Sequence, residues 1–95
     1  PSHVECREDG LMILGEDLSQ YSSRRFCPVE NLDRAGSPFA DLLQQVQNSR
    51  NQDPPRVVVL WIRPSAVATA EKAIAFAKEQ NAPIGWEPAE ADWVF

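Results

Sequence analysis

The chain has little of what metal sites, disulfide scaffolds and membrane spans require. It contains two cysteines, one histidine and four glycines. Two cysteines are too few for a disulfide scaffold, and the single histidine, His3, is too little for an ordinary metal site. The longest apolar run, Val57 to Ile62, has six residues, whereas a membrane span needs about 18. We therefore expect no metal centre and no insertion of these residues into a membrane.

Basic residues are outnumbered, which bears on the partners that the chain can bind. There are 9 Lys and Arg against 14 Asp and Glu, so the formal net charge is −5. Phosphate binding depends on clustered Lys and Arg, so we expect no nucleic-acid partner. The link Arg63–Ala66, where an α/β fold would place a ligand, contains no glycine. Since a phosphate cradle needs glycines for close backbone approach, no nucleotide or other cofactor is expected.

A convergent catalytic set is also missing. The paired carboxylates fall in predicted turns and tails, where solvent keeps both groups alike, whereas acid–base catalysis needs unlike environments facing one cleft. His3 lies near a chain end that is prone to fray, which disfavours a catalytic triad. We therefore predict a protein that is not an enzyme and has no catalytic residues. The alternative is a small ligand-binding or catalytic domain in which Arg63, Glu87 and Asp92 converge on one pocket at the strand ends.

The N-terminal third contains a pattern typical of a β-hairpin. Alternating residues from Val4 are followed by Asp9-Gly10 and then by an apolar run that ends at Leu14. Asp-Gly between two such runs favours a tight turn. A short edge strand is also expected over Phe26–Val29, because Pro28 is tolerated where no ladder partner is needed.

The first predicted helix starts at Ser37 and Pro38, which suit the N-cap and the first helical position. Its apolar residues recur at i, i+3, i+4 and i+7, which is the spacing of one helix face. They are Phe39, Leu42, Leu43 and Val46. Polar residues from Gln47 onward end the helix.

A second helix is predicted from about Ala66 to Gln80, with either Ser65 or Thr69 as its N-cap. Its inner stripe is rich in alanine, which lets a helix lie close against a sheet. The stripe consists of Val67, Ala70, Ile74 and Ala77, with Ala73 beside it. The segment Asn81–Pro83 is expected to end the helix.

Two predicted strands flank this second helix. Arg56–Ile62 is β-branched and aromatic without polar interruption, as expected for a buried central strand, and Ile84–Glu87 is a shorter strand. Strand, helix and strand joined by short links imply a parallel pair. Ala91–Phe95 is expected to form either a last short strand or a packed tail.

Together these elements predict an α+β fold, a two-layer α/β sandwich over the single domain 1–95. The mixed sheet carries an N-terminal hairpin and two helices on one face, in the order ββαβαβ. The other face is expected to be covered, either by the loop 16–37 or by a second copy. The chain starts with Pro1 rather than Met, which suggests a fragment of a longer chain.

Three tryptophans lie in the C-terminal half. Trp61 belongs to the predicted central strand and is expected in the core. Trp86 and Trp93 either seal the sheet edge against the second helix or form a partner-binding surface, because Trp offers a large contact area at small entropic cost. Asp92 and Arg63 complete that candidate surface.

Arg63 and the two cysteines each leave alternatives open. Arg63 either holds a carboxylate at the strand end or forms an ion pair with a nearby acid such as Glu87 or Asp92. Cys6 and Cys27 are either two buried small apolar side chains, a disulfide or a reactive thiol. Nothing in their spacing decides between these alternatives.

The order of the predicted elements resembles the periplasmic domain of the ExbD/TolR biopolymer-transport family. The segments that carry the resemblance are the hairpin Val4–Leu14, the helix Phe39–Val46, the run Val57–Pro64, the Ala-rich helix that follows it and Ala82–Gly85. The most specific parts are Gly85-Trp86-Glu87-Pro88 and the later Asp92-Trp93.

This resemblance implies a non-catalytic interaction and dimerisation domain in the periplasm, tethered by one upstream transmembrane helix. Such domains pair as homodimers and work with a membrane-embedded ExbB/TolQ-like partner that uses the proton gradient. The family's proton-carrying Asp lies in the transmembrane helix, so no functional residue is transferred to this sequence. A cytoplasmic adaptor is the alternative location and role.

Overall fold

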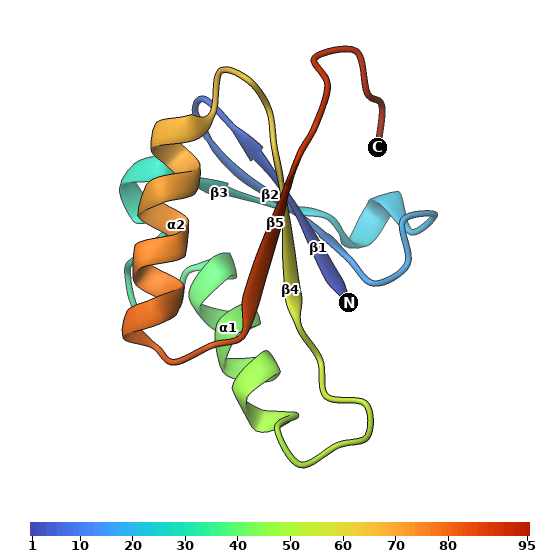
Figure 1. The fold of residues 1–95 in the computed structure, drawn as a ribbon, viewed down its shortest axis with the longest axis vertical. Helices are drawn as coiled ribbons and strands as arrows, with labels where there is room; N and C mark the ends of the chain where they lie inside the picture. Colours follow the sequence, from blue (N-terminus) through green and yellow to red (C-terminus); the bar gives the residue numbers. More distant parts are fainter.

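The computed structural model describes residues 1–95 as one five-stranded mixed sheet with two α-helices against one face (Figure 1). This arrangement confirms the predicted two-layer α/β sandwich. In chain order the elements are β1 (Ser2–Arg7), β2 (Gly10–Gly15), the short 3-10 helix η1 (Tyr21–Ser23), β3 (Arg25–Pro28), the 3-10 helix η2 (Val29–Asn31), α1 (Pro38–Asn48), β4 (Val58–Ile62), α2 (Val67–Glu79) and β5 (Ile84–Pro88).

The sheet order is β3-β2-β1-β4-β5, so the N-terminal strand is the middle one. β1 pairs antiparallel with β2 and parallel with β4, and β4 pairs parallel with β5. The predicted parallel pair around α2 is therefore confirmed, and β4 is an interior strand. The short edge strand predicted over Phe26–Val29 is confirmed as β3, which lies one residue earlier and pairs with β2. The predicted order ββαβαβ is wrong in omitting this strand.

The Asp9-Gly10 turn joins β1 to β2, as predicted. Val4 pairs with Ile13 and Cys6 with Leu11, and all four side chains belong to the core beneath the helices. Because side chains alternate along a strand, the residues between them point to the other face of the sheet. One face of the sheet therefore packs against the helices, and the side chains of the other face must be covered by another part of the chain or exposed to solvent.

Gly10 marks a close approach between β2 and β3. A Cβ added to Gly10 would meet the backbone oxygen of Cys27 and the ring of Phe26. Gly85 also lies in a strand, but a Cβ added there would meet nothing within 4 Å. The two glycines therefore form a matched pair for testing the β2–β3 contact.

We expect Gly10→Ala to lower the free energy of unfolding by about 1–3 kcal/mol, because overpacking must push β3 away from β2. Gly85→Ala is expected to stay within about 0.5 kcal/mol of the wild type, since its site is open. Urea denaturation of both variants measures the difference. Equal losses in the two variants would contradict the close packing of β2 and β3.

Helix α1 begins as its sequence predicts. Ser37 is the N-cap, and its Oγ accepts a hydrogen bond from the Ala40 amide at 2.9 Å and donates one to the Leu32 carbonyl at 2.9 Å. Pro38 is the first helical residue. The predicted apolar stripe is confirmed, since its four residues are the buried ones of the helix. They are Phe39, Leu42, Leu43 and Val46.

Helix α2 departs from its prediction at the N-terminus. Its N-cap is Ala66 and makes no side-chain capping bond, so both predicted caps are wrong. Thr69 is buried instead, and its hydroxyl donates to the Glu8 carbonyl at 3.2 Å. Val67 was expected in the inner stripe but is 56% exposed. The helix face that meets the sheet is therefore turned toward Thr69.

The remaining inner face of α2 is close to the predicted one. Ala70, Ala73 and Ala77 are buried, and Ile74 packs against the core from a partly exposed position. Phe76 adds an aromatic contact, with its ring centroid 6.2 Å from that of Phe39 on α1. Small residues therefore set the distance of α2 from the sheet, and one large ring joins it to α1.

Cys6 and Cys27 are both buried and free. Each pairs with Leu11 from opposite sides of β2, so β2 lies between them. Two strand spacings separate their Cα atoms by about 10 Å, which exceeds the reach of a disulfide. Of the three alternatives that the sequence left open, the structure therefore supports the first, in which Cys6 and Cys27 are two buried small apolar side chains. Burial, helped by the charge of Glu5, raises the pKa of the Cys6 thiol to about 12.

This shifted thiol is expected to make the fold sensitive to alkali. The pKa of Cys6 lies above its ordinary value of 9.0, so the folded state holds a proton that the unfolded state loses above pH 9. The contribution to stability is complete below pH 9 and is lost as the pH rises toward 12. At about pH 10.5 the loss of stability amounts to about 2 kcal/mol.

Urea denaturation at about pH 8 and about pH 10.5 measures this effect in two matched variants. Cys6→Ala removes the thiol, so its free energy of unfolding should fall less between the two pH values than that of Cys27→Ala. The same alkaline loss in both variants would contradict the assignment to Cys6.

Candidate functional site

The face of the sheet opposite the helices, called the open face here, is partly covered by the end of the chain. Figure 1 shows α1 and α2 on one side of the sheet and the C-terminal residues on the other. We call Glu90–Phe95 the C-terminal strap. The residues predicted as a strand or packed tail therefore form a packed tail, since they contain no strand.

Aromatic rings form a row across the open face. The ring of Trp61 on β4 stacks on that of Phe95 at 4.5 Å between centroids, with 14° between the planes. His3 of β1 also lies beside Trp61, with 4.6 Å between the ring centroids. The ring of Trp93 meets Phe95 edge-on at 6.2 Å. The prediction of Trp61 as part of the core is wrong in one respect, because this side chain faces away from the helices and is only half-buried.

Arg63 is held by Glu5, not by the acids that the sequence suggested. Its Nε donates to Glu5 Oε2 at 2.9 Å, and no ion pair joins it to Glu87 or Asp92. Arg7 donates to the other Glu5 oxygen at 3.0 Å. The Glu5 side chain is 5% exposed and that of Arg63 is 16% exposed. The pairing follows from the sheet register, since Glu5 is the partner of Trp61 in the parallel ladder and Arg63 lies two residues beyond it.

Arg63 also binds the backbone of the C-terminal strap. Its Nη1 donates to the carbonyls of Glu90 at 2.7 Å and Ala91 at 3.3 Å, and its Nη2 donates to Trp93 at 2.6 Å. The guanidinium carbon lies 4.7 Å from the Phe95 ring centroid, within cation–π range. All nitrogens of this one side chain are therefore occupied by Glu5 or by the strap.

Arg24, which follows η1, holds the far end of the strap. Its Nη1 donates to the Phe95 carbonyl at 3.0 Å and its Nη2 to the Leu18 carbonyl at 2.9 Å. Its guanidinium lies over the Tyr21 ring at 4.2 Å. The Nε atom of Arg24 is buried and has no hydrogen-bond partner. The loop before β3 and the strap thus share the cover of the open face.

The residues of the alternative pocket do not come together. A cavity of about 420 Å³ beside Arg63 is lined by residues of β1, of the β1–β2 and β4–α2 links and of the C-terminal strap. Its lining is Glu5, Arg7, Glu8, Arg63, Pro64, Ser65 and Ala91. Neither Glu87 nor Asp92 belongs to it, so the convergence that the alternative predicts is not found.

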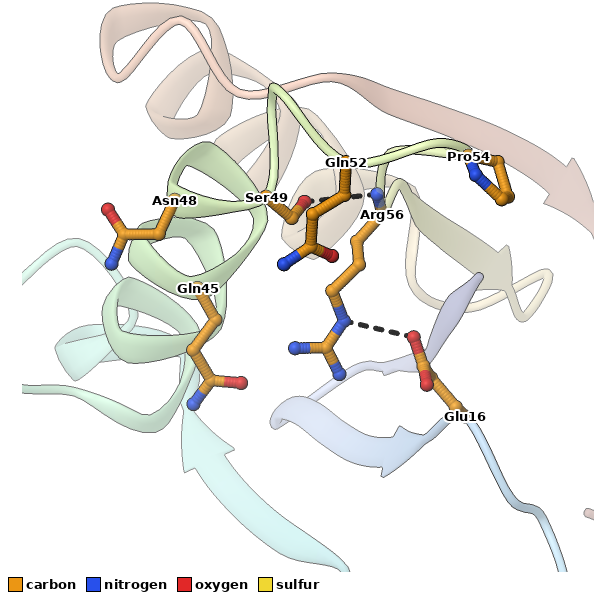
Figure 2. A pocket seen from close by; sticks show the side chains of 7 residues that line it. All are labelled: Glu16, Gln45, Asn48, Ser49, Gln52, Pro54 and Arg56. Carbon is orange, nitrogen blue, oxygen red and sulfur yellow. Dashed lines mark hydrogen bonds and ion pairs between the residues drawn. The ribbon is translucent and has the colours of Figure 1, made fainter.

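The largest cavity, of about 510 Å³, lies between the end of α1 and the loop before β4 (Figure 2). It has no hydrophobic lining residue. Arg56 Nε donates to Glu16 at 3.0 Å, and the Arg56 amide donates to Ser49 Oγ at 3.0 Å. The lining consists of Glu16, Gln45, Asn48, Ser49, Gln52, Pro54 and Arg56. This set offers hydrogen-bonding amides but no nucleophile paired with a base, so it does not define a reaction.

The free edge of β5 carries exposed apolar side chains. Trp86 shares a ladder position with Leu60, so it lies on the helix side of the sheet and near Val67 of α2. Trp86 is 54% exposed and Val67 is 56% exposed. We call Val67, Trp86 and Pro88 the β5-edge patch. Trp86 and Trp93 therefore lie on opposite faces of the sheet and do not form one surface.

Comparison with models of known families, with curated proteins and with solved structures found no match. No helix is both long enough and apolar enough to cross a membrane, and no group of three or more His, Cys, Asp or Glu could hold a metal ion. The geometry of the strap and of the β5 edge must therefore carry any functional argument.

Proposed function

We propose that this chain is a non-catalytic interaction domain, similar to the periplasmic domain of the ExbD/TolR family, that pairs with a second copy through β5. The observation that carries the proposal is the unpaired β5 edge beside the exposed Trp86. In this proposal the domain lies in the periplasm, on a chain anchored in the cytoplasmic membrane. An upstream segment joins it to an ExbB/TolQ-like partner.

The backbone of β5 offers a free hydrogen-bonding edge. The Pro83 carbonyl and the Ala89 amide both point to β4, with hydrogen bonds of 3.3 and 2.9 Å. Amide groups of successive residues point to alternate sides of a strand, so those of Ile84 and Trp86 point away from the sheet. An unpaired edge of this kind can pair with a strand of another chain.

The other edge of the sheet is less suited to pairing. β3 has four residues, Arg25–Pro28, one fewer than β5, and both strands end in a proline. Arg25 also forms an ion pair with Asp41 of α1 at 3.5 Å, which places a charged pair beside that edge. Short length and charge both protect an edge strand from pairing. The β5 edge is therefore the better contact for a second copy.

The β5-edge patch adds side-chain contacts to this edge. Trp86 is the residue type most often found at the energetic centre of an interface, and it is more than half exposed here. A two-fold axis beside β5 would bring the Trp86 of each copy onto the patch of the other, because such an interface uses the same surface twice. Antiparallel pairing of two β5 strands satisfies that symmetry.

Sedimentation equilibrium from about 1 to about 500 μM, with and without the upstream segment, tests the proposal. Truncation of a central interface residue costs about 2 kcal/mol or more, so Trp86→Ala should weaken self-association by about 30-fold. Tyr21→Ala, an exposed aromatic residue far from β5, is the matched control and should leave it unchanged. A strict monomer in both forms of the chain would contradict the proposed pairing.

A further inference from the structure

We propose that the open face contains a peptide-binding groove that the C-terminal strap occupies, and that an extended segment of a partner protein with an aromatic residue at the position of Phe95 can take the place of the strap. We call the site the strap groove. It lies on the face opposite the β5-edge patch, so it does not depend on the proposed pairing. The strap is recognised through its backbone and one aromatic ring, and it is held lightly.

The strap groove recognises backbone. Arg63 donates to three main-chain carbonyls of the strap and to none of its side chains. Arg24 likewise holds the main-chain carbonyl of Phe95. Every peptide has such carbonyls, so these donors can bind any segment that follows the same path. Glu5 keeps Arg63 in position, because it holds the Nε atom and leaves both terminal nitrogens to the segment above.

An aromatic floor supplies the preference for a side chain. The Trp61 ring stacks on Phe95 and also contacts His3. Offset stacking on such a ring favours an aromatic residue at the position of Phe95. The Arg63 guanidinium lies against the same ring, so an aromatic side chain gains from both partners, whereas an aliphatic one gains only burial.

The charges around the groove are balanced. Arg7, Arg24 and Arg63 lie there with three carboxylates, those of Glu5, Glu8 and Glu87. Glu8 lines the same cavity as Arg7 and Arg63, and Glu87 shares a ladder position with Trp61. The segment is therefore selected by its main-chain carbonyls and its aromatic ring, not by its charge.

The strap is held lightly enough to be replaced. It forms no strand and adds no residue to the core cluster. Val94 is 94% exposed and Trp93 keeps a large part of its side chain in solvent. The only backbone hydrogen bond between strap residues joins the Trp93 amide to the Glu90 carbonyl at 3.2 Å. Displacement therefore costs the contacts of two arginines and one ring, and leaves the sheet intact.

The test uses the full chain and a labelled peptide, Glu-Ala-Asp-Trp-Val-Phe, followed by fluorescence anisotropy. The resident strap competes at an effective concentration in the millimolar range, so the wild type should bind the peptide weakly. Phe95→Ala removes the stacked ring of the competitor and should bind the peptide at least tenfold more tightly. Trp61→Leu added to Phe95→Ala removes the floor and should abolish this gain.

Two controls make the result specific. Val94→Ala changes a strap residue that is 94% exposed, and it should bind the peptide as the wild type does. The peptide Glu-Ala-Asp-Ala-Val-Ala lacks both rings and should bind at least tenfold more weakly than the full peptide. Equal affinity of Phe95→Ala and Val94→Ala, or of the two peptides, would overturn the proposal.

Hydrogen exchange on the wild type provides a second measurement that needs no variant. A displaceable strap opens locally, so the Trp93 amide should exchange at least tenfold faster than the ladder amides of β1 and β4. Exchange of the strap only together with those strands would overturn the proposal, because the strap would then leave the face only on global unfolding.

Discussion

Replacement of Glu5 by glutamine is expected to lower the free energy of unfolding by about 3 kcal/mol. The carboxylate is nearly inaccessible and bridges Arg7 and Arg63. Glutamine keeps the shape but removes the charge, which leaves two guanidinium groups facing each other across one neutral amide. Urea denaturation near pH 7 measures the loss. Since Arg63 also holds the strap, the fluorescence of Trp61 and Trp93 should change as well.

The matched control for this prediction is Glu16→Gln. Glu16 pairs with Arg56 at 3.0 Å, a distance close to those of the Glu5 ion pairs, but the Glu16 side chain is 50% exposed. An ion pair in solvent contributes about 0–1 kcal/mol, so the control should lose less than 1 kcal/mol on the same scale. If Glu5→Gln is no more destabilising than Glu16→Gln, the buried bridge is not a stabilising feature of the open face.

Replacement of Phe39 by alanine is expected to cost about 3–5 kcal/mol. Phe39 is fully buried at the first turn of α1, where it meets Phe76 of α2. Its removal leaves a cavity at the only aromatic contact between the two helices, and rigid strands below cannot collapse to fill it. Thermal and urea unfolding both report the loss.

Phe26→Ala is the control for Phe39→Ala. Phe26 lies on the edge strand β3 and is more than a third exposed, so less apolar surface is returned to water when it is truncated. We expect a loss of about 1 kcal/mol. Comparable losses in the two variants would mean that the core around Phe39 is less tightly packed than the burial of Phe39 indicates.

Helix α1 shows how much of this fold is predictable from the sequence. Its N-cap, its first residue and its buried stripe all follow from local chemistry, because Ser37 and Pro38 favour a helix start and the apolar spacing defines one face. The hairpin around Asp9-Gly10 is predictable for the same reason. Both signals act within a few residues and need no knowledge of the remaining chain.

Helix α2 shows where local signals fail. Ser65 and Thr69 are both good capping residues, but the tertiary contact of Thr69 with Glu8 determines which side of the first turn faces the sheet. That contact turns Val67 out to solvent. The orientation of the first turn of α2 therefore depends on a residue about 60 positions earlier, which periodicity cannot supply, and the N-cap is neither candidate but Ala66.

The candidate site was predictable only in part. Arg63, Trp86, Trp93 and Asp92 were singled out by residue type, but Glu5 was not. Its importance arises from the parallel register of β1 and β4, a pairing between segments more than fifty residues apart. The stack of Phe95 on Trp61 likewise depends on how the chain turns back after β5. Neither contact leaves a repeating pattern in the sequence.

The position of β1 has a mechanical consequence. The first strand of the chain lies in the middle of the sheet, hydrogen-bonded to β2 on one side and β4 on the other. A tension applied at Ser2 along the strand would act on both ladders in parallel, so many hydrogen bonds must break together before the strand can slide. The domain is thus built to resist a pull on its N-terminal end, and to yield more readily when the pull comes from the lightly attached C-terminal end.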